Sequence, residues 1–213
     1  MQYIRLISLV IALFLLHAPR VFADAYEEAL NAVQANDIMA AEALLAKGLD
    51  VNTTDASANT LLMIAVRENH PDLVKRLLTR QAKVGARNSY GETALMLAAA
   101  KGNLDVVRLL IERGAAIKQP GWNALIYAAW RGHTEVVKFL LDKGADIDAV
   151  SPSGVSALML ASRSGYIETV KLLLAEAADP NLKTDTGATA LAWALKEGHR
   201  DVAELLELRG ARK

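Results

Sequence analysis

The chain has 213 residues, of which 53% are apolar and 5% aromatic, and it contains no cysteine. This composition is typical of a folded helical protein rich in alanine and leucine, and the missing cysteines lead us to expect neither a disulfide nor a lipid anchor. The 24 basic residues balance 24 acidic ones, so the overall charge gives no reason to expect nucleic acid or an anionic membrane as a partner.

Residues 1–23 have the pattern of a secretory signal peptide. Arg5 supplies a positive charge, Leu6–Leu16 is an apolar run, and Val21–Ala23 carries small residues of the kind that signal peptidase recognises. The run is shorter than the roughly 20 residues of a membrane-spanning helix, so we favour cleavage over an uncleaved N-terminal anchor and expect no stable membrane insertion. Cleavage would remove both Arg5 and Arg20, which leaves 22 basic and 24 acidic residues, a net charge of −2.

From residue 60 onwards the sequence repeats one short motif, in which a threonine, asparagine or serine precedes an apolar stretch that ends in alanine. The copies begin at Thr60, Thr93, Asn123, Ser156 and Thr189, and the intervals are 33 residues, except for 30 between the second and third copies. A fixed period of this length predicts a stacked helical repeat. Because a solenoid presents a long surface and no closed pocket, the period favours binding over catalysis.

Residues 88–119 illustrate how one copy is built. Thr93 is suited to cap a first helix, and Gly102 ends it. A second helix follows, with apolar residues on one side. We expect its Leu109 and Leu110 in the core.

These residues resemble the ankyrin repeat family: Gly91–Ala99 reads G-E-T-A-L-M-L-A-A, beside the signature G-x-T-P-L-H-x-A-A, and Arg131–Asp148 resembles the remainder. The resemblance implies an all-α ankyrin-repeat solenoid of about six helix-turn-helix repeats with short hairpin loops. We expect one domain over 24–213. Its repeats are expected at approximately 24–54, 55–87, 88–119, 120–150, 151–183 and 184–213.

The signature's histidine is replaced by methionine, isoleucine or alanine, so we expect its hydrogen bonds between repeats to be absent. Three other histidines, His70, His133 and His199, share one slot two repeats apart, or about 20 Å. Metal ligands must meet within a few ångströms, so we expect structural roles for them. No phosphate loop, dinucleotide fingerprint or nucleophile motif appears, and we predict no enzyme activity, cofactor or metal.

In ankyrin repeats the first helices and hairpin tips line a concave side that binds partners. The end of each first helix points into it and carries a basic residue: Arg67, Lys101, Arg131, Arg163 and Lys196. Such a row favours a partner with an acidic surface. The helix dipole explains a basic bias at these positions equally well.

Aromatic residues narrow the predicted site. Trp130 lies beside Arg131, and Tyr90 and Trp122 are expected at nearby hairpin tips. Tryptophan, tyrosine and arginine dominate binding hot spots, so we predict a footprint centred on Trp130 and Arg131. Alternatively, Trp122 fills the gap left by the shortened hairpin, and Trp193 is expected in the core.

We therefore predict a non-catalytic protein-interaction scaffold, exported to a bacterial periplasm or secreted, with a protein partner. The resemblance leaves two other binding roles open: an immunity or inhibitor protein that neutralises a toxin, and an accessory factor supporting a periplasmic enzyme such as a catalase. A third alternative, an enzyme or haem carrier, requires a ligand pocket.

Overall fold

The structure is a computed structural model that describes residues 25–212, so the predicted signal peptide lies outside the described residues. These residues form two compact units, 25–82 and 83–212. Within this range the regular structure is helical, apart from two isolated β-bridges between Thr54 and Thr60 and between Val150 and Ser156. None of these helices is long and apolar enough to cross a bilayer. The predicted repeat boundaries stay predictions.

The first unit begins with a helix over 25–34, which is followed by α2 (Ile38–Ala46), α3 (Leu61–Arg67) and α4 (Pro71–Thr79). Six consecutive residues at the start of α3 are buried, and this helix packs against α4. The Tyr26 hydroxyl donates a hydrogen bond to the carbonyl oxygen of Thr54. This bond joins the first helix to the loop that precedes α3.

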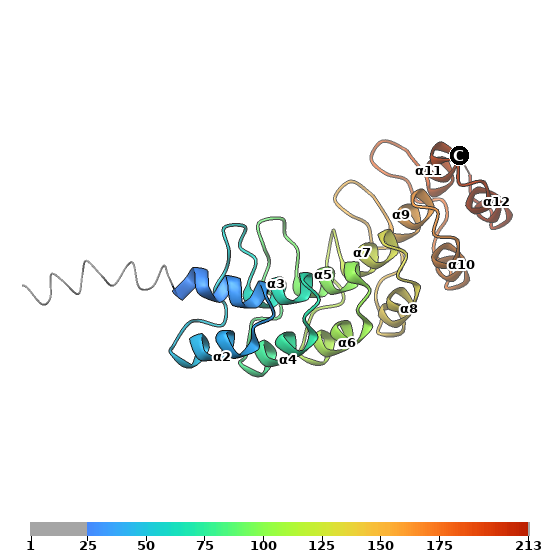
Figure 1. Cartoon of the computed structure of the whole chain (residues 1–213). Helices are drawn as coiled ribbons and strands as arrows, with labels where there is room; N and C mark the ends of the chain where they lie inside the picture. The colour runs from blue at the N-terminus through green and yellow to red at the C-terminus, as the bar shows by residue number, and fades with distance from the viewer. Residues whose placement is uncertain (1–24, 213) are drawn as a thin grey trace, which may run out of the picture. The chain divides into compact units, whose positions relative to one another are not determined.

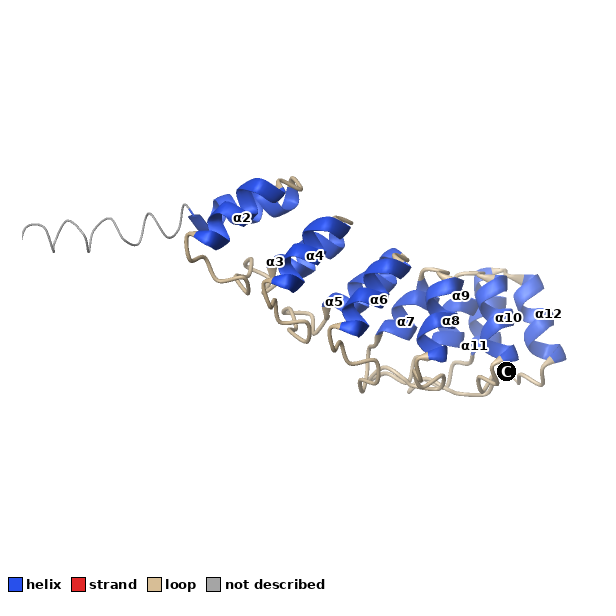
Figure 2. Ribbon diagram, turned by 90° about the horizontal axis from the view of Figure 1, so that it is seen from below, coloured by secondary structure: helices blue, strands red, loops and turns tan. Residues whose placement is uncertain are grey.

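The second unit contains four pairs of helices in two rows: α5 (Ala94–Lys101) with α6 (Leu104–Glu112), α7 (Ala124–Trp130) with α8 (Thr134–Asp142), α9 (Ala157–Arg163) with α10 (Ile167–Ala175), and α11 (Ala190–Glu197) with α12 (Arg200–Leu208). The first helices α5, α7, α9 and α11 pack side by side, and the second helices form the other row (Figure 1). In Figure 2, α8, α10 and α12 run nearly parallel.

Each first helix of the second unit begins directly after a residue whose side chain caps it. The side chains of Thr93, Asn123, Ser156 and Thr189 each accept a hydrogen bond from the backbone N–H three residues later. Such a bond satisfies one of the free N–H groups at a helix start and contributes about 1 kcal/mol. The predicted cap at Thr93 is therefore confirmed, and the other three copies repeat it.

The core lies between the two rows of helices. Alanines such as Ala98 and Ala128 are fully buried, and their small side chains allow the first helices to pack closely. In α6, Leu110 is completely buried as predicted, but the prediction for Leu109 is wrong because it is only half-buried. Leu109 lies about 100° around the helix from Leu110 and about 60° from the buried Val106, at the edge of the buried stripe.

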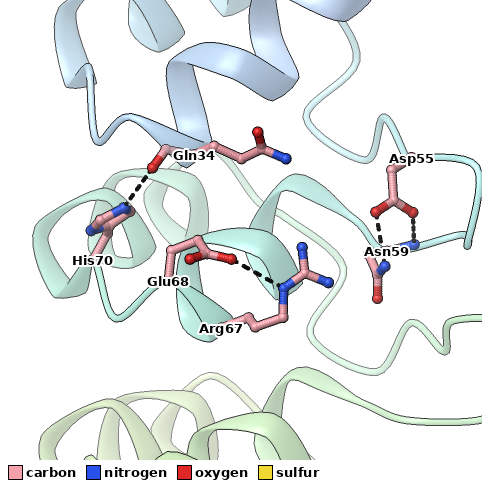
Figure 3. A network of polar contacts seen from close by, with 6 residues as sticks. All are labelled: Gln34, Asp55, Asn59, Arg67, Glu68 and His70. Carbon is pink, nitrogen blue, oxygen red and sulfur yellow. Dashed lines mark hydrogen bonds and ion pairs between the residues drawn. The ribbon is translucent and has the colours of Figure 1, made fainter.

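Ring side chains join successive repeats. The His133 ring nitrogen Nε2 lies 3.0 Å from the carbonyl oxygen of Ala100, and His199 Nε2 lies 3.1 Å from that of Arg163. His70 makes the same contact to Gln34 in the first unit, at 3.1 Å (Figure 3). The bonds that were expected to be lost with the signature histidine are thus replaced by bonds from another histidine in the repeat.

Candidate functional site

The structure places seven of the eight predicted binding residues in the second unit. Arg67 is the exception, since it lies in the first unit. Its Nε atom donates to Glu68 Oε1 at 3.2 Å, as Figure 3 shows, so its charge is partly neutralised. Burial favours a higher pKa for the nearby Asp55, but hydrogen bonds from Asn59 and Ser57 and the charge of Arg67 outweigh it, and the pKa of Asp55 lies below its ordinary value.

Three aromatic rings gather along α7, and we call Trp122, Tyr127 and Trp130 the aromatic strip. The centroid of the Tyr127 ring lies 5.9 Å from that of Trp122 and 6.2 Å from that of Trp130, with an interplanar angle of 79° in both pairs. Edge-to-face pairs of this kind contribute about 0.5–1.5 kcal/mol beyond the area they bury. Both indoles remain 40% exposed, so the strip is ordered and accessible.

Tyr127 is held in place by the preceding hairpin. Its hydroxyl donates to Glu92 Oε1 at 2.8 Å, and Asn88 Nδ2 donates to the other oxygen, Oε2, at 2.9 Å. Burial raises the pKa of Tyr127 above its ordinary value, and the hydrogen bond to the Glu92 carboxylate raises it further. The phenol therefore stays neutral and keeps donating, which fixes the ring between the two indoles.

Arg131 completes this surface. Its guanidinium group lies over the Trp130 ring, 4.5 Å from the centroid. It forms no ion pair with any residue between 25 and 212. A cation stacked on an indole is pre-ordered, and its N–H groups remain available to a partner's carboxylate.

The remaining predicted cations differ in whether an acidic side chain of the described chain lies close to them. Lys101 and Lys196 are exposed and have no ion-pair partner in the described chain. Arg163 lies 3.6 Å from Glu197 Oε1, and its guanidinium is 5.4 Å from the centroid of the Trp193 ring. Lys101 and Lys196 are therefore unpaired cations within residues 25–212, whereas Arg163 is partly neutralised.

The structure differs from the predictions for two aromatic residues, Trp193 and Tyr90. The prediction that Trp193 belongs to the core is wrong, because its indole is only half-buried. Its slot holds the smaller Leu160 in the preceding repeat, and the larger indole extends beyond the core to where Arg163 covers it. Tyr90 is 77% exposed, as expected of a hairpin tip, but it makes no ring contact with the aromatic strip.

The shortened hairpin leaves an open hollow. This hollow has a volume of about 490 Å³ and is lined by Ile117 to Gly121 and Asn123 on one side and by residues between Ala145 and Val150 on the other. Trp122 is not among the lining residues; it packs edge-on against Tyr127. The indole therefore belongs to the aromatic strip, while the hollow beside it stays open.

Sequence comparison identifies the family. The sequence profile described as "Ankyrin repeats (3 copies)" matches five overlapping stretches: 11–88, 29–120, 62–151, 116–184 and 148–213. The chain belongs to the ankyrin repeat family. The predicted all-helical ankyrin-repeat fold is thereby confirmed.

A solved structure agrees with this assignment. The crystal structure of an ankyrin repeat domain from Acinetobacter baumannii AYE, determined at 1.00 Å resolution, is similar to this chain with a TM-score of 0.73 and 32% sequence identity. The similarity covers 86% of this chain and 98% of that one. A comparison with curated proteins finds no match. Ankyrin repeats serve generally as protein–protein interaction modules.

Proposed function

We propose that this ankyrin-repeat protein is a non-catalytic module that is exported to the periplasm and binds a protein partner through the aromatic strip and Arg131. The observation that carries the proposal is the ordered, accessible cluster of three rings and an unpaired guanidinium on α7 and at its two ends. Residues of these types dominate the binding energy of protein interfaces. The exposed cations Lys101, on the adjacent helix α5, and Lys196, on α11, favour a partner with an acidic surface.

The shifted ionisable groups support a binding role. General acid–base catalysis at neutral pH needs a group whose pKa is brought towards 7. The pKa values of Asp55 and Tyr127 are moved away from that range, that of Tyr127 upwards by burial and the bond to Glu92, and that of Asp55 downwards by hydrogen bonds and the charge of Arg67, which outweigh its burial. Export is proposed from the signal-peptide pattern of residues 1–23.

Affinity capture from a periplasmic extract tests this function. The bait is the chain from residue 24 onwards, compared with a Trp130→Ala/Arg131→Glu variant. Lys138→Glu provides the matched control, because Lys138 is an exposed cation on the second helix of the same repeat. We expect one partner to be retained by the parent chain and by the control but lost from the double variant. Equal retention by all three would place the interface elsewhere.

A further inference from the structure

The aromatic strip offers hydrogen-bond donors and almost no acceptors. Neither indole N–H, of Trp122 or of Trp130, has a hydrogen-bond partner among the described residues, and Arg131 adds a guanidinium group that can only donate. The nearest carboxylate, that of Glu92, already accepts from Tyr127 and Asn88 on its two oxygens. A ligand rich in acceptors and poor in donors therefore matches this surface.

The backbone of α7 supplies few acceptors, since a helix presents free carbonyl groups only in its last turn. The carbonyl groups of Ala128 and Ala129 accept hydrogen bonds at the end of the helix, and the Asn123 side chain accepts from the Ile126 N–H at its start. A partner strand would therefore find no row of main-chain groups to pair with on this surface. A partner helix would likewise bring carbonyl groups that its own backbone already engages.

A proline-rich segment has the required chemistry. In the polyproline II conformation every backbone carbonyl stays free, and proline has no backbone N–H to leave unsatisfied. Aromatic-lined grooves bind such segments in several classes of domain, where the pre-ordered chain loses little entropy. The spacing also agrees: successive ring centroids are 5.9 and 6.2 Å apart, and two residues of polyproline II rise by about 6 Å.

We propose that the aromatic strip binds a proline-rich segment of a protein partner in the polyproline II conformation, with an acidic residue of that segment paired to Arg131. The inference rests on the proposed function and specifies the class of partner. The proline rings lie against the indoles, the indole N–H groups donate to peptide carbonyls, and the stacked guanidinium holds the carboxylate. The exposed cation Lys101 favours the same acidic flank.

Fluorescence titration with a synthetic peptide tests the inference. The probe is a run of eight prolines with glutamate at each end, and the control peptide replaces the prolines with alternating glycine and serine. A Trp193→Phe background removes the indole outside the strip, so that emission reports only Trp122 and Trp130. We expect saturable binding of the proline peptide, at least about tenfold tighter than that of the control peptide, and a loss of about tenfold or more in Trp130→Ala.

Two further variants separate recognition from folding. Trp130→Phe keeps an aromatic ring and should recover part of the affinity, and Lys138→Glu should bind as the parent chain does. The thermal midpoint of each variant is measured alongside, so that an unfolded variant is not mistaken for a non-binding one. Absent binding, or equal binding of the glycine–serine peptide, would overturn the inference.

Different results would contradict the polyproline inference and the proposed interface. If the proline peptide does not bind but extract capture still depends on Trp130 and Arg131, only the polyproline inference is lost. If an acidic amphipathic helical peptide binds more tightly than the proline peptide, the inference is also lost. If capture is independent of both residues, the proposed interface itself is wrong.

Discussion

The aromatic ring of Tyr166 lies directly over the α carbon of Gly132, so that a β carbon at residue 132 would be only 2.6 Å from the ring. The same arrangement recurs between Gly102 and His133, at 2.4 Å, and between Gly165 and His199, at 2.5 Å. All three glycines also have positive φ angles, between 72° and 74°. Glycine is therefore required at this slot both for its backbone conformation and for the ring that covers it.

Substituting Gly132 with alanine should be far more costly than the same change at Gly198. Both residues have positive φ, but a β carbon at Gly198 would meet nothing within 4 Å. We expect about 1 kcal/mol of destabilisation at Gly198 from backbone strain, and about 1–3 kcal/mol more at Gly132 from displacing the Tyr166 ring. Urea unfolding measures both. Equal costs, or no relief of the Gly132→Ala cost in a Tyr166→Ala background, would contradict this explanation.

Ala177 has a left-handed backbone conformation, so replacing it with glycine should raise the stability. Ala177 has a φ of 65° at a slot where Gly144, one repeat earlier, has a φ of 85°. Alanine in this region costs about 1–2 kcal/mol, and the greater chain entropy of glycine when unfolded offsets only part of that cost. Ala177→Gly should stabilise the protein by about 0.5–1 kcal/mol, whereas Gly144→Ala should destabilise it. A loss of stability in Ala177→Gly would show that strain at this residue is negligible.

Two serines of α9 should respond in opposite ways to alanine. Ser162 is fully buried, and its hydroxyl has no hydrogen-bond partner within residues 25–212, whereas Ser156 Oγ caps α9 by accepting from the Met159 N–H at 3.3 Å. Removing an unsatisfied buried hydroxyl should stabilise the fold by about 1 kcal/mol. Removing the cap should cost about 1 kcal/mol. Thermal and urea unfolding of both variants checks the signs, and a destabilised Ser162→Ala would mean that the hydroxyl has a partner in solution.

The Tyr127–Glu92 hydrogen bond predicts a pH dependence at alkaline pH. Because the folded-state pKa of Tyr127 lies above the ordinary value of 10.0, its stabilising effect is complete below pH 10 and is lost as the pH rises further. Between about pH 10 and 12 the unfolding free energy of the parent chain should fall more steeply than that of Tyr127→Phe. Urea unfolding at several pH values measures the difference. Parallel curves for the two proteins would mean that Tyr127 ionises normally in the folded chain.

Much of the candidate site followed from the period of the sequence. Once the repeat is aligned, Trp130 and Arg131 fall at the end of a first helix and Trp122 at a hairpin tip, so their proximity could be predicted. Tyr127 was missed because its slot is occupied by Leu97 and Leu160 in neighbouring repeats, and an aromatic residue there is indistinguishable from core. Its hydrogen bond to Glu92 depends on side-chain geometry, which periodicity does not contain.

Other differences arise from the size and surroundings of particular side chains. The period assigned Trp193 to a core slot, but it carries no information on whether an indole fits where leucine does. The period also showed that three residues are missing before Gly121. It did not indicate whether the space left by the shortened hairpin closes or stays open as the hollow. The separation into units 25–82 and 83–212, which leaves Arg67 apart from the other cations, has no counterpart in the repeat pattern.

Site-specific photocrosslinking in the periplasm tests the central claim most directly. A photoreactive amino acid is placed at residue 130, on the aromatic strip, and in a parallel strain at residue 138, on the second helix of the same repeat. We predict a single protein adduct from residue 130 and none from residue 138. An adduct from residue 138 alone, or none from either position in cells that hold the protein in the periplasm, would contradict the assignment of the aromatic strip as the partner-binding surface.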